Sequence, residues 1–171
     1  MVKFLKFKSS YLKGVTLDKK CAEEVNELAV WRVLRGILKG LLALHRYHIY
    51  HFDPHSNNIL INDNNVKIID FDHSKTYFML EMMEERKEKN SIFGINDFIA
   101  PEVACGGIYR PAADIWAAGM NGMYLCKHGK FSFDVRGNPE LQLPAQYSPQ
   151  LEGFLGEMLN MNYKDRRMLP N

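Results

Sequence analysis

Residues 25–45 carry the strongest helical pattern in the chain, and this pattern limits the folds that the sequence can adopt. Apolar residues recur about every 3.6 positions, which places them on one face of a helix: Leu34, Ile37, Leu38, Leu41 and Leu42. Good helix formers fill much of the remaining segment. Gly36 and Gly40 lie four positions apart and permit the close approach of another element. The segment therefore predicts a long amphipathic helix that packs tightly against a neighbour.

Two short strands are predicted after this helix. The runs NILI and VKIID are joined by NDNN, whose Asn and Asp residues suit a tight turn. Residues 114–127 are apolar on nearly all sides, as in a buried helix, and residues 150–161 return to helical spacing. Residues 81–89 fit either a charged helix or a mobile loop, whereas residues 138–149 contain three prolines and should be mostly irregular. The predicted fold class is mainly α with a small antiparallel β-hairpin.

Length and composition limit the class of protein. The 171 residues suit one domain, which would bury about two-thirds of its unfolded surface. A net charge of +2 is too small to indicate nucleic acid binding, and no apolar run has the length of a membrane span. Three widely spaced cysteines favour neither a disulfide framework nor a zinc site, so a reducing compartment is expected. We therefore expect a cytosolic or nuclear protein, with neither nucleic acid nor membrane as its partner.

The first twenty residues are basic, with Asp18 as the acidic residue among six lysines. Apolar residues are interleaved with the lysines, and Phe4, Leu5 and Phe7 are candidates for contact with a partner's groove. A merely solvated leader is the alternative. The predicted organisation is an N-terminal basic and apolar arm, residues 1–20, followed by one folded domain, residues 21–171.

Asp53, Asn58 and Asp70 form the candidate functional constellation. Taken alone they are a weak metal signal, because Asp and Asn residues in loops form turns more often than they bind ions. Their context strengthens the signal. Asp53 follows a helix and His51, and Asn58 opens the first short strand. Asp70 closes the second strand and precedes Phe71.

This arrangement resembles the catalytic loop and the metal-binding segment of a protein kinase. The resemblance continues through APE at Ala100–Glu102 and DIWAAG at Asp114–Gly119, and extends to Arg166 near the end. It covers the chain from about Tyr11 onward and implies the fold of a kinase large lobe, the C-lobe, without the small N-lobe.

The resemblance also implies a role for each matched residue. Asp53 takes the position of the base that accepts the substrate hydroxyl proton, and Asn58 and Asp70 take the positions of the magnesium ligands. Leu60 matches the floor of the adenine pocket, so Leu60 and Asp70 are the nucleotide positions. Four further residues match positions with a structural role: His51, Glu102, Asp114 and Arg166.

Three positions depart from the kinase pattern. Phe52 replaces the Arg before the catalytic Asp, and His55 replaces a Lys that contacts the transferred phosphate. Asp72 replaces the Gly after Asp-Phe, which removes the backbone freedom of Gly and adds a carboxylate. A strained or remodelled loop is the simpler interpretation of Asp72, and an additional metal ligand is the alternative.

The N-terminal segment is the largest departure. Before Val25 there is no glycine-rich loop and too little chain for a small lobe, which would supply much of the positioning in phosphoryl transfer. The stretch from Phe133 to Leu143 is also short for the helix that docks substrates in several kinases. We therefore expect a chain that is not an enzyme and binds no cofactor, magnesium-ATP included. The catalytic and metal positions would then be relics.

Without a small lobe above them, Leu60 and Phe71 would form an exposed apolar patch of the kind that marks binding sites. The expected occupant is the small lobe of a host protein kinase, and self-association through the same face is a further expectation. A lone large lobe resembles the truncated kinase-like proteins of baculoviruses, which blunt host kinases of eukaryotic initiation factor two alpha. That resemblance implies a non-catalytic inhibitor in the host cytoplasm. Two alternatives stay open: a degenerate kinase that acts when a partner lends its small lobe, and a decoy for a kinase substrate.

Overall fold

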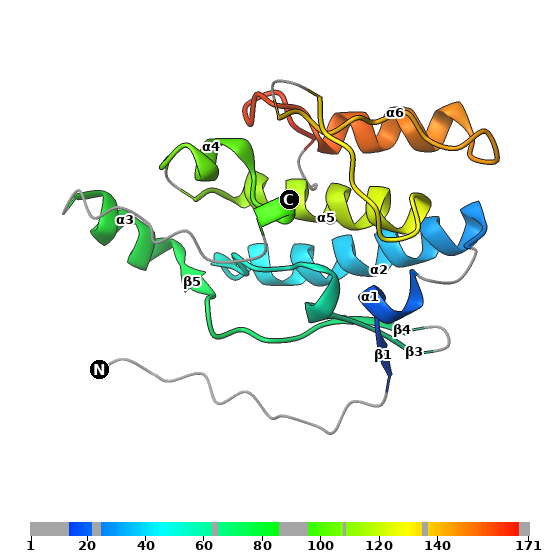
Figure 1. Ribbon diagram of the computed structural model, residues 1–171. Helices are drawn as coiled ribbons and strands as arrows, with labels where there is room; N and C mark the ends of the chain where they lie inside the picture. Colours follow the sequence, from blue (N-terminus) through cyan, green and yellow to red (C-terminus); the bar gives the residue numbers. More distant parts are fainter. Residues whose placement is uncertain are drawn as a thin grey trace.

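The computed structural model describes residues 14–21, 25–62, 65–85, 96–107, 109–134 and 137–167. Its three longest helices are stacked, with a small sheet beneath the lowest of them (Figure 1). From bottom to top in Figure 1 these helices are α2 (Glu27–His45), α5 (Pro111–Cys126) and α6 (Pro149–Met158). The shorter helical elements are α1 (Leu17–Lys20), α3 (Tyr77–Glu85), α4 (Pro101–Ala104), and the 3₁₀ turns η1 (Ser56–Asn58) and η2 (Asn96–Phe98). The predicted class, mainly α with a small antiparallel hairpin, is confirmed.

Helix α2 matches the predicted helix closely. Its first turn is capped by Asn26, whose side-chain oxygen accepts a hydrogen bond from the Ala29 amide at 2.9 Å. Leu34, Ile37 and Leu41 of the predicted apolar face are buried in the core, whereas Leu38 and Leu42 are half-buried at its edge. The close approach predicted at Gly36 is confirmed, because a Cβ atom there would overlap the side chain of Val66.

The predicted hairpin consists of β3 (Ile59–Asn62) and β4 (Asn65–Ile68), paired antiparallel with Ile59 opposite Ile68. Three two-residue strands were not predicted. One of them, β1 (Val15–Thr16), adds to the outer edge of β3. The other two, β2 (Ile49–Tyr50) and β5 (Lys75–Thr76), pair with each other as a separate antiparallel ribbon. The candidate site residues Asp53, Asn58 and Asp70 all lie in the stretch of chain between the two strands of this ribbon.

Helix α5 is the centre of the fold and is buried along nearly its whole length. It begins at Pro111, earlier than the predicted start at residue 114, because proline at a first helical position needs no amide partner. One apolar cluster joins α5 to α2 and α6, and a second joins α5 to the loop after β2 and to α4. Both the helical layers and the candidate site are therefore anchored on α5.

The described part of the predicted N-terminal arm belongs to the folded domain. Leu17 in α1 is fully buried, and the Tyr124 hydroxyl donates to the Asp18 carboxylate at 2.7 Å. The predicted boundary at residue 20 is thus not where the packing of the domain begins. Residues 1–13, with Phe4, Leu5 and Phe7, lie outside the described residues, so a partner-binding arm there stays a prediction.

The remaining segments agree with the sequence pattern. Part of the charged segment 81–89 continues α3 as far as Glu85, and residues 86–95 lie outside the description. In the described residues between α5 and α6 the chain forms no helix, only an isolated bridge between Phe133 and Pro139. Within the described ranges, no helix is both long enough and apolar enough to cross a membrane.

Candidate active site

Asp114 on α5 organises the loop that carries the candidate site. It is fully buried, and each of its carboxylate oxygens accepts two hydrogen bonds. Oδ2 accepts from the His51 amide at 3.0 Å and contacts the His45 ring nitrogen at 2.8 Å. Oδ1 accepts from the Phe52 amide at 3.1 Å and from the Tyr109 hydroxyl at 3.0 Å. The structural role expected of Asp114, which is to hold the amides before Asp53, has this geometric basis.

These contacts also set the charge of Asp114. Burial alone would raise the pKa of its carboxyl group. The hydrogen bond from His45, the electrostatic interactions with the His45 and His51 rings, and the His51 amide oppose burial and bring the pKa below its ordinary value. Asp114 is therefore ionised in the folded protein and acts as a fixed acceptor for the loop backbone.

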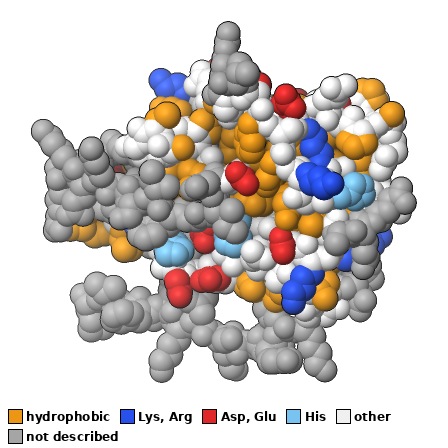
Figure 2. Space-filling model, in the orientation of Figure 1, with side chains coloured by type: hydrophobic (Ala, Val, Ile, Leu, Met, Phe, Trp, Pro, Cys, Tyr) orange, Lys and Arg blue, Asp and Glu red, His pale blue; other side chains and the backbone are white. Residues whose placement is uncertain are grey.

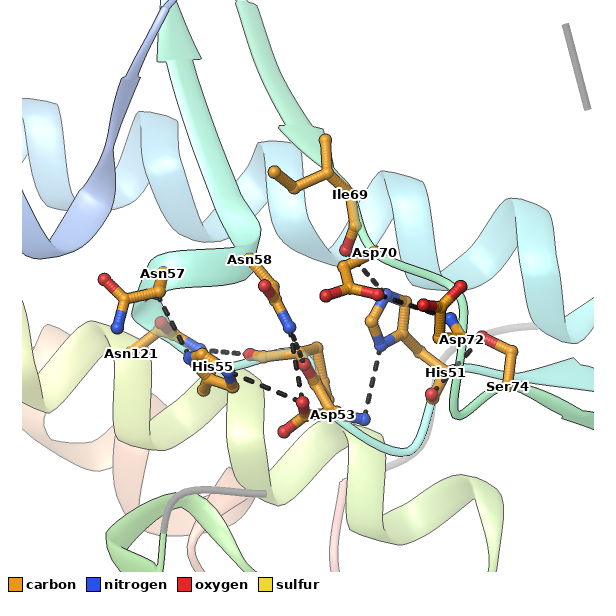
Figure 3. Close-up of polar contacts among 11 residues, drawn as sticks. His51, Asp53, His55, Asn57, Asn58, Ile69, Asp70, Asp72, Ser74 and Asn121 are labelled. Carbon is orange, nitrogen blue, oxygen red and sulfur yellow. Dashed lines mark hydrogen bonds and ion pairs between the residues drawn. The ribbon is translucent and has the colours of Figure 1, made fainter. Parts of the chain in front are cut away.

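His51 links the catalytic-type loop to the segment after β4. Its Nε2 atom lies 3.1 Å from the Ile69 carbonyl oxygen, and its Nδ1 atom accepts from the Asp53 amide at 3.3 Å (Figure 3). Because Nδ1 accepts, the hydrogen of the neutral ring lies on Nε2, where it is donated to the carbonyl. Burial lowers the pKa of His51 despite the opposing charge of Asp114, which favours this neutral form.

Asp53 and Asn58 lie together and are joined by hydrogen bonds. The Asn58 side-chain amide donates to the Asp53 carbonyl at 3.0 Å and to the Asp53 carboxylate at 3.3 Å (Figure 3). Asn58 ends the turn η1, which begins after His55, and the His55 ring accepts the Asn57 amide as a cap at 3.2 Å. The other ring nitrogen of His55 lies 3.5 Å from the Asp53 carboxylate. The residue that replaces the kinase Lys is therefore in contact with the candidate base.

Asp70 lies two residues after the end of β4, across from Asn58 in Figure 3. Its backbone φ is 64°, in the left-handed region that Asp tolerates better than most residues. The Asp72 amide donates to the Asp70 carboxylate at 3.4 Å, so Asp72 contacts it through its backbone. In Figure 2 acidic and histidine side chains gather over the segment that joins β4 to β5.

The donor atoms of Asn58 and Asp70 fit a magnesium ion. Asn58 uses its amide nitrogen for Asp53, so its remaining oxygen is the atom suited to a metal, and Asp70 offers a carboxylate. Hard oxygen donors are the ligands that magnesium prefers, and the ion usually keeps waters or substrate phosphates as its other ligands. In the described part of the chain, no group of three or more His, Cys, Asp or Glu side chains is arranged so that it could hold a metal ion. The site thus suits a metal brought with phosphates better than a metal held by protein alone.

Phe52 has an unusual backbone conformation and an aromatic partner that the sequence did not reveal. Its φ of 72° is strained for a bulky residue, and tertiary contacts hold it there. The ring stacks on Tyr109 with centroids 3.6 Å apart, and the Lys75 ammonium lies 5.5 Å from its centroid. His45 contacts Asp114 across 69 positions of sequence, so no local spacing could have identified it, whereas Tyr109 lies five positions before Asp114 and its proximity was the available signal.

Asn121 is a second contact that sequence analysis missed. Its side-chain amide donates to the Pro54 carbonyl at 2.8 Å and to the Ala117 carbonyl of its own helix at 2.7 Å. The residue is fully buried on α5, about two turns beyond Asp114. It therefore fixes the loop on the far side of Asp53 from the Asp114 contacts. A polar residue in an otherwise apolar helix was the available signal.

Glu102 and Arg166 form the predicted pair. The two guanidinium nitrogens of Arg166 donate to the two Glu102 carboxylate oxygens at 2.8 and 2.9 Å. Arg166 also donates to the carbonyls of Ala112 and Asn160, and its guanidinium lies 5.0 Å from the Trp116 ring centroid. The pair joins α4 to the chain after α6, which agrees with the structural role expected of it.

The predicted partner-binding and nucleotide positions Leu60 and Phe71 are each half-buried. Leu60 lies in the middle strand of the small sheet, opposite Lys67. The Phe71 ring leans on His51 with centroids 5.0 Å apart and borders a groove of about 540 Å³. The structure therefore places both residues near the site, and their contact with a nucleotide or a partner stays a prediction.

Comparison with known proteins gives the chain a family. A model of the protein kinase domain matches residues 5–170. Serine/threonine-protein kinase dst3 of Dictyostelium discoideum is 28% identical over 167 residues, which cover 89% of this chain and 29% of that protein. Serine/threonine-protein kinase pakC of the same organism is 25% identical over 84% of the chain and 31% of its own length. Serine/threonine-protein kinase PAK 1 of Mus musculus is 28% identical over 91% of the chain and 30% of its own length.

These matches overturn two expectations. The chain was expected not to be an enzyme, but the relatives are named as serine/threonine-protein kinases and the matching family is that of protein kinase domains. The absence of a cofactor was also expected, whereas protein kinases work with magnesium-ATP. Both expectations rested on a few altered positions and on the short N-terminal segment. The chain spans less than a third of the length of each of these three relatives. The chain belongs to the protein kinase domain family.

Proposed function

We propose that this chain forms the large C-terminal lobe of a protein kinase domain and that its site serves phosphoryl transfer from magnesium-ATP to a protein hydroxyl group. The order of its elements supports the proposal: a long helix, the Asp53 loop, a hairpin, the Asp70 segment, and the buried helix that carries Asp114. The observation that carries it is the hydrogen-bonded pair of Asp53 and Asn58, fixed from below by Asp114.

Each residue of the site has a chemical role in this proposal. The Asp53 carboxylate orients the substrate hydroxyl and accepts its proton. The Asn58 oxygen and the Asp70 carboxylate hold magnesium, which when bound neutralises charge on the phosphates. His55 can donate from Nε2 because its Nδ1 accepts the Asn57 amide, so it is a candidate donor to a phosphate oxygen. Catalysis by such a site depends mainly on positioning, which the buried contacts of Asp114 supply.

Reconstitution tests this proposal. The purified chain is mixed with a separately produced small lobe of mouse serine/threonine-protein kinase PAK 1, and labelled phosphate transfer from ATP to a protein substrate is measured. Transfer should require both parts and should be lost in Asp53→Asn and Asp70→Asn, while Asp97→Asn, an exposed residue outside the site, keeps it. Absence of transfer from the folded wild-type chain, alone and with the small lobe, would refute the proposal.

A second candidate function uses the same face of the protein. We infer that the chain can also bind the small lobe of another kinase and so inhibit it by competition with that kinase's own large lobe. The half-buried Phe71 and the groove beside it support this inference, since the groove has an apolar floor of Leu44, Val66 and Ile68. Four cationic side chains border the same groove: Arg32, Arg35, Lys39 and Lys67.

The finer form of this inference names the target. In it the chain acts in the host cytoplasm on a kinase of eukaryotic initiation factor two alpha and sustains translation during a viral infection. Inhibition should then follow the groove, so Phe71→Ser should weaken inhibition of such a kinase, while Phe133→Ser, an exposed residue elsewhere, should not. Equal inhibition by both variants would contradict this candidate, and inhibition of no kinase of that class would remove its target.

A further inference from the structure

An apolar groove runs along the outer face of α2 beside α6, away from the candidate active site. It has a volume of about 390 Å³ and contains five apolar side chains: Trp31, Leu34, Leu38, Leu42 and Phe154. The Trp31 and Phe154 rings close one end, with centroids 5.0 Å apart. In Figure 1 the start of α2 and the whole of α6 lie on the same right-hand side of the molecule. We call this surface the α2–α6 groove.

The rim of the α2–α6 groove is cationic. Arg35 and Lys39 are exposed on the ridge of α2 and line the groove, and no acidic side chain lines it. In the described part of the chain, neither cation forms an ion pair with a carboxylate. Two uncompensated positive charges therefore flank an apolar floor.

Two acidic residues beside the groove have partners of their own. Glu27 accepts hydrogen bonds from the Trp31 ring nitrogen at 3.0 Å and from the Ser148 amide and hydroxyl at 2.7 and 2.6 Å. Glu157 is paired with Arg167, whose guanidinium lies over the Phe154 ring. The electrostatic preference of the groove is thus for an anionic ligand.

The dimensions of the groove fit a short helix. From Trp31 to Leu42, α2 advances by about 17 Å, the length of roughly three helical turns. Leu34, Leu38 and Leu42 form one ridge of α2 with a repeat of four residues. Leu34 is buried beneath the groove, and the half-buried Leu38 and Leu42 offer the spacing against which side chains of a second helix can pack. An apolar stripe with the same spacing would match them along the whole groove.

We propose that the α2–α6 groove is a docking site for an acidic amphipathic helix of a partner protein. The apolar stripe of this helix fills the floor between Leu38 and Phe154, and its carboxylates pair with Arg35 and Lys39. The apolar contacts supply affinity, and the rim charges select an acidic over a basic helix and speed association. The proposal is independent of catalysis at Asp53.

A pair of labelled peptides tests the proposal by fluorescence anisotropy with the whole chain. Each has about twelve residues, with Leu at helical spacing, and carries either Glu or Lys at the other positions. The Glu peptide should bind the wild-type chain, and the Lys peptide should bind at least about tenfold more weakly. Raised salt should reduce the difference between them.

Variants of the chain locate the binding. Arg35→Glu with Lys39→Glu should weaken the Glu peptide by roughly tenfold or more and strengthen the Lys peptide. The matched control, Lys19→Glu with Lys130→Glu, makes the same change in net charge at exposed positions outside the groove and should leave both affinities unchanged. Arg35 and Lys39 also border the groove beside Phe71, so two further variants separate the grooves. Leu38→Ala should weaken both peptides, whereas Phe71→Ser should leave both affinities unchanged. Thermal melts of each variant establish that it is folded.

Three outcomes would overturn the proposal. The first is no binding of the Glu peptide at millimolar concentration. The second is equal loss of binding in the control variant, which would indicate a nonspecific charge effect. The third is self-association of the chain that Leu38→Ala abolishes, because a second copy and not an acidic helix would then occupy the groove.

Discussion

The Tyr109 hydroxyl donates to the buried Asp114 carboxylate at 3.0 Å while its ring lies stacked on Phe52. One side chain thus supports the candidate catalytic loop in two ways. It satisfies the acceptor that holds the Phe52 amide, and it packs against the ring of a residue with positive φ. Burial and the neighbouring negative charge of Asp114 raise the pKa of Tyr109 well above its ordinary value, so the hydroxyl remains a donor at any physiological pH.

Removal of this hydroxyl should destabilise the fold. In Tyr109→Phe the Asp114 carboxylate loses one of its donors without any change in the aromatic stack. We expect the free energy of unfolding to fall by about 1.5–3 kcal/mol, the usual contribution of a hydrogen bond to a charged group, while the Phe52 amide still donates to the same oxygen. Urea denaturation measures the change. Tyr47→Phe is the matched control because Tyr47 is 79% exposed, and an equal loss there would contradict the prediction.

Loss of Glu102 should be more costly. Glu102→Ala leaves the Arg166 guanidinium, whose side chain is fully buried, without its carboxylate, and breaking a buried pair in this way costs about 3–5 kcal/mol. Glu157→Ala breaks the exposed pair with Arg167, which should contribute at most about 1 kcal/mol. Circular dichroism melts compare the two variants, and similar melting temperatures for both would show that burial of the first pair contributes little.

The sequence predicted those elements that are long enough to show a repeating pattern of apolar residues. Helix α2 and the hairpin of β3 and β4 have enough residues for this pattern to be recognised. The strands β1, β2 and β5 have two residues each, too few to display alternation, and depend on pairing between distant segments.

The sequence also predicted some residues of the candidate site and missed others. Asp53, Asn58 and Asp70 stand at recognisable positions in the sequence, and the structure brings Asp53 and Asn58 into contact. The contact between His45 and Asp114 spans 69 positions and involves a His that closes an amphipathic helix, where nothing local distinguishes it from a surface residue. The motifs therefore reveal the candidate site residues and Asp114 better than they reveal a partner such as His45, which no motif contains.

The proposed function predicts that magnesium-ATP stabilises the chain. At a ligand concentration about a hundredfold above the dissociation constant, one-site binding adds about 2.7 kcal/mol to the free energy of unfolding. Asp70→Asn should remove this effect because the metal loses a charged ligand, whereas Asp97→Asn should keep it. Thermal shift with and without magnesium-ATP is the measurement. An undiminished shift in Asp70→Asn would show that the nucleotide binds without the predicted metal ligand.

Stability should also depend on pH through His51. Its pKa in the folded protein is lowered by burial, so the unfolded chain takes up a proton, near its ordinary pKa of about 6.5, that the folded chain resists. The unfolded state then binds more protons, and the free energy of unfolding decreases as the pH falls below about 6.5. Asp114, with a lowered pKa, loses its contribution in the same direction but only in more acidic solution.

A titration of melting temperature tests the role of His51. Between about pH 8 and pH 5.5 the wild-type melting temperature should fall. His51→Asn should be less stable at the upper pH but lose less on acidification. His128→Asn alters an exposed histidine and should follow the wild-type slope. If His51→Asn retains the full wild-type slope, another group causes the pH dependence.

The close approach of α2 and β4 gives the last prediction. Alanine normally stabilises a helix by about 1 kcal/mol relative to glycine. At Gly36, however, the new methyl group would overlap the side chain of Val66, and the backbone of one element would have to move. We expect Gly36→Ala to lower the free energy of unfolding by roughly 1–3 kcal/mol, the range for an overpacked core.

Gly153 in α6 provides the matched control, because a Cβ atom there would meet nothing within 4 Å. Gly153→Ala should therefore stabilise the protein by up to about 1 kcal/mol. Urea denaturation of both variants gives the comparison. A gain in stability from both substitutions would mean that α2 can withdraw from β4 without cost, and the hairpin would then not fix the position of the Asp70 segment against the helix.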